Sequence, residues 1–409
     1  MRMLPRDPEG RRRSRRLLLV AYLAFVGLGL PDAVTGVAWP SIRETFGVGQ
    51  DGLGLLLSCA AAGYLASSLA AGGLVRRLGI GRLLAASSAL VAVALAGYAT
   101  TGLWPAFLLC AFALGAGGGA IDAALNLFVA VAFGARQLNW LHAFYGVGAA
   151  LGPLLMTAVL AAGWSWRWGN AAIACVLAAL SLAYFATRNV WSVAPGRERG
   201  DGDAGGAPVT AGQALRLSAV RLHVAVFFLL TGVEATAGQW SYTVLTEARG
   251  VSPAAAGVCV GGFWAMFTLA RVVAGAVVLR VGAVRLARAS AAGSAVGALL
   301  FAFSPAEAPM VGVTGLWLVG LALGPLFPGL MAETPRRLGA GAAAHAVGFQ
   351  VAAAVAGAAA VPALAGALAA RGGFGLEAVA AVLVVGALLF LAMHERIVAA
   401  ADGGGGGRG

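Results

Sequence analysis

The chain alternates between long apolar segments and short polar ones. Twelve apolar segments follow one another, and each is close to the roughly 20 residues that a helix needs to cross a bilayer. Their approximate limits are 17–39, 53–75, 83–101, 105–133, 138–162, 168–187, 221–246, 254–279, 286–304, 309–332, 343–370 and 374–393. This pattern predicts an all-α polytopic membrane protein with twelve transmembrane helices.

Composition and charge support this prediction. The 409 residues are 60% hydrophobic and only 11% charged, which is too few charges to cover a soluble protein. A net charge of +12 would indicate nucleic-acid binding in a soluble chain, but here the basic residues, all arginine, gather in short alternate loops. Only Arg43, Arg167, Arg249 and Arg371 fall in the other loops, and Arg271 lies within a span. We therefore predict the cell (inner) membrane, with both termini cytoplasmic and no nucleic-acid partner.

The order of polar and apolar segments divides the chain into five parts. A basic, disordered amino terminus (1–16) precedes a six-helix bundle (17–187), and a flexible cytoplasmic linker (188–220) joins it to a second bundle (221–394). A disordered cytoplasmic tail (395–409) follows.

The two halves repeat with a shift of 203 residues. Gly47 then coincides with Gly250 and Gly79 with Gly282. The shift also superimposes the arginines that flank the second glycine pair, which are Arg77 and Arg82 in one half and Arg280 and Arg285 in the other. These matches indicate two homologous bundles, and we assign the four arginines to structure and gating.

One segment combines close packing with buried polar groups. Residues 115–119 hold four glycines, which allow neighbouring helices to approach closely in lipid. Asp122 and Asn126 follow in the same span, four residues apart and so on one helix face. An acid at this depth costs roughly 3 kcal/mol on insertion scales, which is tolerated when it faces a partner or a polar cavity. Because apolar surroundings favour the neutral carboxyl, such a group can load and release a proton; the alternative is an acid that only bonds a neighbouring helix.

Two further acids lie within spans, and both are candidates for proton coupling. Asp32 follows Pro31 in the first span, where the proline permits a bend, and Glu234 takes the equivalent depth in the seventh span. For each acid the alternative is a helix–helix hydrogen bond. Arg271 requires an anionic partner or helix-end carbonyls, either as a latch or for an acidic solute.

Other polar and aromatic residues within the spans are candidates for solute binding. Amides offer two-way hydrogen bonding, a Trp ring offers the flat apolar face on which sugars stack, and a His ring can relay protons. For each of them, packing or an interhelical hydrogen bond is the alternative. The candidates are Asn126, Asn139, His142, Gln239, Trp240 and Gln350.

The chain resembles the major facilitator superfamily, on its two six-span halves, its central linker and the loop Gly73-Leu-Val-Arg-Arg-Leu-Gly79. Arg76 stands where the family has Asp, which puts that loop's gating salt bridge in question. Within the family the chain is similar to the fucose/galactose–proton symporters. The residues that carry this likeness are Gly119–Asn126, Asn139–His142, Gly146–Pro153, Gly232–Glu234, Gly238–Trp240, Phe263–Trp264 with Arg271, and Gly324–Pro328.

The resemblance implies proton-coupled uptake of a small sugar-like solute by a monomer, at a central site between the bundles. It makes Asp122 the proton carrier and adds Trp264 to the candidates for solute binding. A proton-driven efflux antiporter for drugs or metabolites is the alternative, because Gly148–Pro153 partly matches an antiporter motif. An enzyme is not expected, because no nucleophile and base, metal-ligand spacing or nucleotide loop appears, and no cofactor is implied. A solute sensor would predict an added signalling domain.

Overall fold

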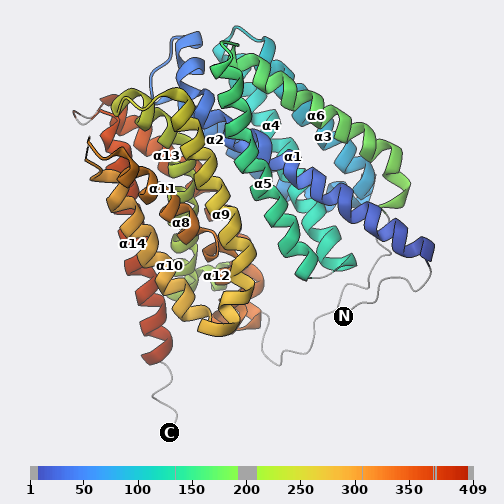
Figure 1. Ribbon diagram of the computed structural model, residues 1–409. Coiled ribbons are helices and arrows are strands. Elements are labelled where there is room, and N and C mark those ends of the chain that lie inside the picture. Colours follow the sequence, from blue (N-terminus) through green and yellow to red (C-terminus); the bar gives the residue numbers. More distant parts are fainter. Residues whose placement is uncertain are drawn as a thin grey trace. The chain divides into compact units, whose positions relative to one another are not determined.

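The computed structural model describes residues 8–133, 135–191, 210–305, 307–371, 373 and 375–403. These residues form helices and connecting loops without a β-strand (Figure 1). The helices of the first half are α1 (Pro8–Phe46), α2 (Gly52–Leu78), α3 (Ile80–Thr100), α4 (Trp104–Ala132), α5 (Ala135–Ala161), α6 (Trp166–Thr187) and the short η1 (Arg188–Val190). Those of the second half are α7 (Ala211–Arg216), α8 (Ser218–Thr243), η2 (Val244–Ala248), α9 (Pro253–Val281), α10 (Ala283–Ala302), α11 (Pro309–Leu323), α12 (Leu326–Leu338), α13 (Ala340–Arg371) and α14 (Glu377–Gly403).

The prediction of twelve membrane-spanning helices is confirmed. Twelve spans within the described residues are long and apolar enough to cross a membrane. Contacts group the chain into two compact units, Met1–Arg199 with Ser252–Gly261, and Gly200–Val251 with Gly262–Gly409.

The predicted repeat is visible in the backbone. Gly47 and its counterpart Gly250 both adopt positive φ, at 63° and 64°, and so do Gly79 and Gly282, at 75° and 83°. Glycine tolerates this conformation without strain. The second pair forms the turns α2–α3 and α9–α10, so the same tight turn recurs at equivalent points of the two halves. The four flanking arginines assigned to gating are exposed at these turns.

Glycines set the helix spacing in the first unit. A side chain at Gly115 would overlap the backbone carbonyl oxygen of Ala60 on α2, and one at Gly119 would lie 2.5 Å from the carbonyl oxygen of Tyr64. On the adjoining face of α4, a side chain at Gly117 would lie 2.8 Å from the carbonyl oxygen of Ser87 on α3. The glycine-rich segment therefore packs against two helices at once, in the small-residue mode typical of membrane bundles.

Three helix boundaries differ from the predicted domain limits. Helix α1 begins at Pro8, within the amino terminus predicted to be disordered. The described end of the linker forms α7, which a Thr210–Gln213 capping box begins, whereas residues 192–209 lie outside the described part. Helix α14 continues to Gly403 instead of ending near 394, because the buried Ile397 and an ion pair from Glu395 to Arg288 hold its last turns. Residues 404–409 also lie outside the description.

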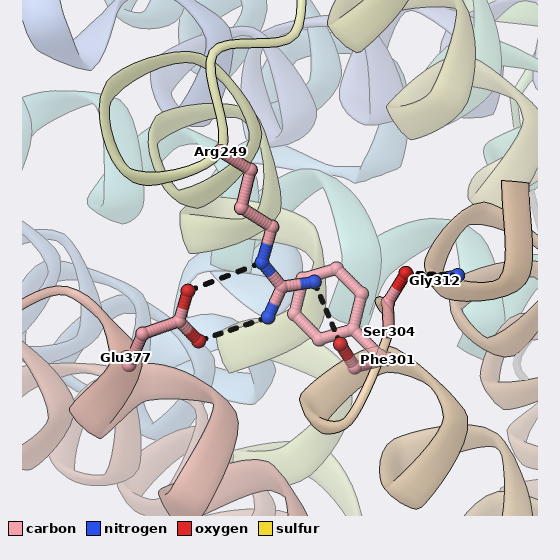
Figure 2. A network of polar contacts seen from close by, with 5 residues as sticks. All are labelled: Arg249, Phe301, Ser304, Gly312 and Glu377. Carbon is pink, nitrogen blue, oxygen red and sulfur yellow. Dashed lines mark hydrogen bonds and ion pairs between the residues drawn. The ribbon is translucent and has the colours of Figure 1, made fainter. Parts of the chain in front are cut away.

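A polar clamp holds one end of the second unit (Figure 2). Arg249 follows the π-helix η2 and forms a bidentate pair with Glu377 at the start of α14, at 3.2 and 2.9 Å. Its Nη1 also donates to the carbonyl oxygen of Phe301 at 2.6 Å, and its guanidinium lies 4.5 Å from the centroid of that ring. One side chain thus ties the end of α8 to α10 and α14.

Candidate functional site

Asp122 lies at the centre of a hydrogen-bond network between α2 and α4. The Tyr64 hydroxyl donates to Oδ2 of Asp122 at 2.7 Å, and the Asn126 amide donates to Oδ1 at 2.9 Å. Both carboxylate oxygens therefore have a donor. The predicted shared face of Asp122 and Asn126 appears here as direct contact, whereas the role of Tyr64 was not foreseen. Among the described residues, no donor reaches Oδ1 of Asn126, so this acceptor remains available for a solute hydroxyl.

A second acid–tyrosine pair joins α1 and α5. The Tyr145 hydroxyl donates to Oδ2 of Asp32 at 2.8 Å. Asp32 is exposed although it lies within a membrane span, and it is close enough to Asp122 for the two carboxyl groups to interact electrostatically. Tyr64 interacts electrostatically with both acids. Two carboxyl groups, each held by a tyrosine, thus lie in one region of the first unit.

Two further candidates, His142 and Asn139, lie on α5. His142 is half-buried, and its ring stands nearly perpendicular to that of Phe25, with the ring centroids 5.6 Å apart. Asn139, one turn earlier on the helix, is exposed. His142 precedes Tyr145 by three residues, so these two side chains lie on the same helix face.

In the second unit, Arg271 is positioned by a break between two helices. The chain leaves α11 at Gly324 and resumes as α12 after Pro325, within a single span. Nε of Arg271 donates to the Gly324 carbonyl at 3.3 Å, and the guanidinium lies 4.2 Å from the Phe267 ring centroid. Glu234 of α8 interacts electrostatically with Arg271. The arginine therefore has both the helix-end carbonyl and the nearby acid that its depth in the membrane requires.

Two predicted solute ligands are packed in the interior instead. Trp240 is fully buried, and its Nε1 donates to the carbonyl oxygen of Pro362 on α13 at 3.0 Å. Gln350 is also fully buried, and its amide donates to the Thr334 hydroxyl at 3.1 Å. Both side chains have a hydrogen-bond partner in the protein and are closed off from solvent in this structure, and their predicted contact with the solute stays a prediction.

The remaining two candidates for solute binding in this unit, Gln239 and Trp264, lie close together on α8 and α9. The indole of Trp264 is 4% exposed, and its Nε1 has no hydrogen-bond partner within the described part of the chain. The absence of a side chain at Gly238 makes room for it, because a Cβ there would lie 2.6 Å from the Trp264 ring. Gly238 follows Glu234 by one helical turn and precedes Gln239, which is 8% exposed. The indole N–H thus lies beside Gly238, one helical turn from Glu234, without an acceptor among the described residues.

The two tyrosines are functional candidates that the sequence analysis missed. A Tyr hydroxyl in an apolar helix needs an acceptor when it is buried, which is a signal for a polar partner. The signal does not say which helix supplies that partner. Among the described residues, no group of three or more His, Cys, Asp or Glu side chains could hold a metal ion.

The chain is similar to known proteins in sequence. The model of the Major Facilitator Superfamily matches residues 21–246 of the chain. A glucose/mannose transporter of Bacillus subtilis, GlcP, is 23% identical over 77% of this chain and 78% of its own length. An uncharacterised transporter of the same superfamily from Yersinia pestis is 25% identical over 75% of this chain and 77% of its own.

Solved structures share the fold at low sequence identity. The nucleoside transporter NupG superimposes with a TM-score of 0.74 at 15% identity, over 92% of this chain and 99% of its own. A D-xylose–proton symporter gives 0.72 at 17% identity, over 91% and 96%. The fucose:proton symporter FucP of E. coli gives 0.62 at 17% identity, over 93% and 98%.

Proposed function

Because the chain belongs to the Major Facilitator Superfamily, a family of transporters, we propose that it moves a small polar, sugar-like solute across the cytoplasmic membrane by alternating access, coupled to protons. In this proposal a monomer is the working unit, both termini face the cytoplasm, and the solute travels inward with a proton.

The network around Asp122 is the observation that carries this proposal. An ionisable group within a membrane span is expensive and is a functional candidate by default. When Asp122 is ionised, both of its oxygens accept hydrogen bonds, from Tyr64 and from Asn126. A proton on the carboxyl turns one oxygen into a hydroxyl, which donates and is a weaker acceptor, so the hydrogen bond that this oxygen receives is weakened or replaced.

This rearrangement would link proton binding to solute binding. The Asn126 amide donates to Asp122, and its own oxygen is open to a solute hydroxyl. Protonation of Asp122 at Oδ1 would release the amide to bond the solute as well. Because linkage is reciprocal, a solute bound at Asn126 would then favour the protonated acid.

The position of Asp32 supports a hydrated path through the first unit. An exposed carboxyl within a span contacts either lipid or water, and lipid is the far more costly surrounding. The nearby Asp122 would lie at the same water-filled surface. The sequence relative described as a glucose/mannose transporter, together with the sugar–proton symporters of the same fold, supports a solute rich in hydroxyl groups.

A transport assay with a solute panel tests this proposal. The purified protein is reconstituted in liposomes that enclose a pH-sensitive dye, and monosaccharides, nucleosides and apolar cations are added outside in turn. We expect acidification of the interior with at least one monosaccharide, and its loss in Asp122→Asn. Asp51→Asn, in the loop before α2, is the matched control and should transport normally. Proton movement with apolar cations alone would favour the efflux antiporter and overturn the sugar assignment.

A further inference from the structure

Three helices of the second unit bring basic side chains together at the end predicted to face the cytoplasm. His223 lies near the start of α8, Arg337 in the last turn of α12 and His394 near the end of α14. His394 is fully buried and His223 is 4% exposed. The two imidazoles and the Arg337 guanidinium are close enough to interact with one another electrostatically.

Part of this cluster is internally satisfied. Gln350 of α13 exchanges hydrogen bonds with the Thr334 hydroxyl at 3.1 and 3.3 Å, and its Nε2 lies 3.4 Å from Nδ1 of His223. Because Nε2 of Gln350 is a donor, Nδ1 of His223 acts as the acceptor in this contact. The proton of a neutral His223 then resides on its other nitrogen.

Other polar atoms of the cluster have no partner. Both ring nitrogens of His394 and Nη1 of Arg337 are buried without a hydrogen bond to any residue that the structure describes. The acid next to His394, Glu395, is occupied by a bidentate pair with Arg288 of α10 at 2.7 and 2.8 Å. Glu395 also interacts electrostatically with His394, but both of its oxygens accept from Arg288, so no carboxylate among the described residues bonds to the unpartnered nitrogens of the cluster.

We propose that this cluster, His223, Arg337 and His394, binds one small inorganic monoanion of the halide class. Nη1 of the Arg337 guanidinium is buried, and a cationic group with a buried, unpartnered N–H is stabilised by a counter-charge, which a water molecule does not supply. The unfilled groups are mainly N–H donors, the ligands that an anion needs, because neutral imidazole donates one N–H and the guanidinium donates several. Full burial of His394 favours a monatomic anion over a phosphate or a lipid headgroup, and the half-exposed Arg337 offers the way in.

A bound anion would hold together three helices of the second unit. It would join α8, α12 and α14 at one end of the second unit, as the Arg249–Glu377 pair joins α8, α10 and α14 at another point. The proposal does not rest on the identity of the transported solute.

Thermal unfolding of the purified full-length protein tests the site. The unfolding midpoint is measured during titration with sodium chloride or sodium bromide, with gluconate keeping the ionic strength constant. We expect a saturable increase with either halide and none with gluconate, because ligands that bind only the native state stabilise it by mass action. In Arg337→Gln the half-saturating halide concentration should rise at least tenfold, and His394→Phe should act in the same direction.

Arg336→Gln is the matched control, because Arg336 is exposed and pairs with Glu333 on the same helix at 3.2 Å. It should retain the halide response within about twofold. If chloride and gluconate act alike, or if the halide response is the same in Arg337→Gln as in the wild type, the anion site is refuted. Stabilisation by added anionic lipid without any halide response would also refute it, in favour of a headgroup site. Since wild-type protein answers the first comparison, the test does not depend on whether a variant folds.

Discussion

Because α4 packs closely against α2, we expect two glycines of α4 to differ in how well they tolerate a side chain. A Cβ at Gly115 would overlap the backbone of Ala60, and a carbonyl oxygen cannot rotate aside as a side chain can. A Cβ at Gly118 would instead meet only Cδ1 of Leu28 at 3.3 Å, the far end of a flexible side chain. Gly115→Ala should therefore force the helices apart, whereas Gly118→Ala should be accommodated.

The magnitude follows from packing energies. Overpacking of a well-packed interior costs about 1–3 kcal/mol. Both substitutions gain the same helix propensity, about 1 kcal/mol from Gly to Ala, so this term cancels in the comparison. We expect Gly115→Ala to be about 1–3 kcal/mol less stable than Gly118→Ala.

Thermal unfolding in detergent, followed by tryptophan fluorescence, measures the difference. A midpoint for Gly115→Ala clearly below that of Gly118→Ala is expected. Transport should fall as well, because Tyr64 and Asp122 lie on these two helices and must stay in contact. Equal midpoints, or a lower one for Gly118→Ala, would refute the close packing of α2 and α4.

Further substitutions test individual contacts. Tyr64→Phe removes one of the two side-chain donors to Asp122. Loss of a hydrogen bond to a charged group costs about 1.5–3 kcal/mol, so initial rates of proton-coupled uptake should fall about 10- to 100-fold. Arg249→Ala should destabilise the protein by about 1–2 kcal/mol more than Glu377→Ala, because the arginine also bonds the carbonyl oxygen of Phe301 and stacks on the ring of that residue. Equal free energies of unfolding for the two variants in denaturant titration would contradict this. If Trp240 serves only packing, Trp240→Phe should lower stability by about 1 kcal/mol and leave the KM for the solute unchanged; a large rise in KM would instead support the predicted contact with the solute.

The sequence was sufficient for features that depend on position along the chain. The spans could be recognised because a bilayer imposes a minimum apolar length, and the structure contains twelve of them. The repeat could be recognised because turns that need positive φ require glycine, as at Gly79 and Gly282. The contact of Asp122 with Asn126 could be anticipated because both lie on one helix.

Features that depend on which helices are neighbours could not be predicted from the sequence. Tyr64 is 58 positions from Asp122 along the chain, and no periodicity indicates that α2 and α4 pack together. The rotation of a helix about its axis is also hidden when apolar residues surround it on all sides. The sequence therefore did not indicate that Trp240 and Gln350, two predicted solute ligands, are fully buried in this structure.

The most direct test of the account separates solute exchange from proton-driven accumulation in Asp122→Asn. An amide resembles the protonated carboxyl in shape and lack of charge, so the variant should still bind the solute and reorient. We predict that it retains solute counterflow, in which labelled and unlabelled solute exchange across the liposome membrane, and loses accumulation driven by a proton gradient. Accumulation at the wild-type level would contradict the account, because Asp122 would then not carry the proton.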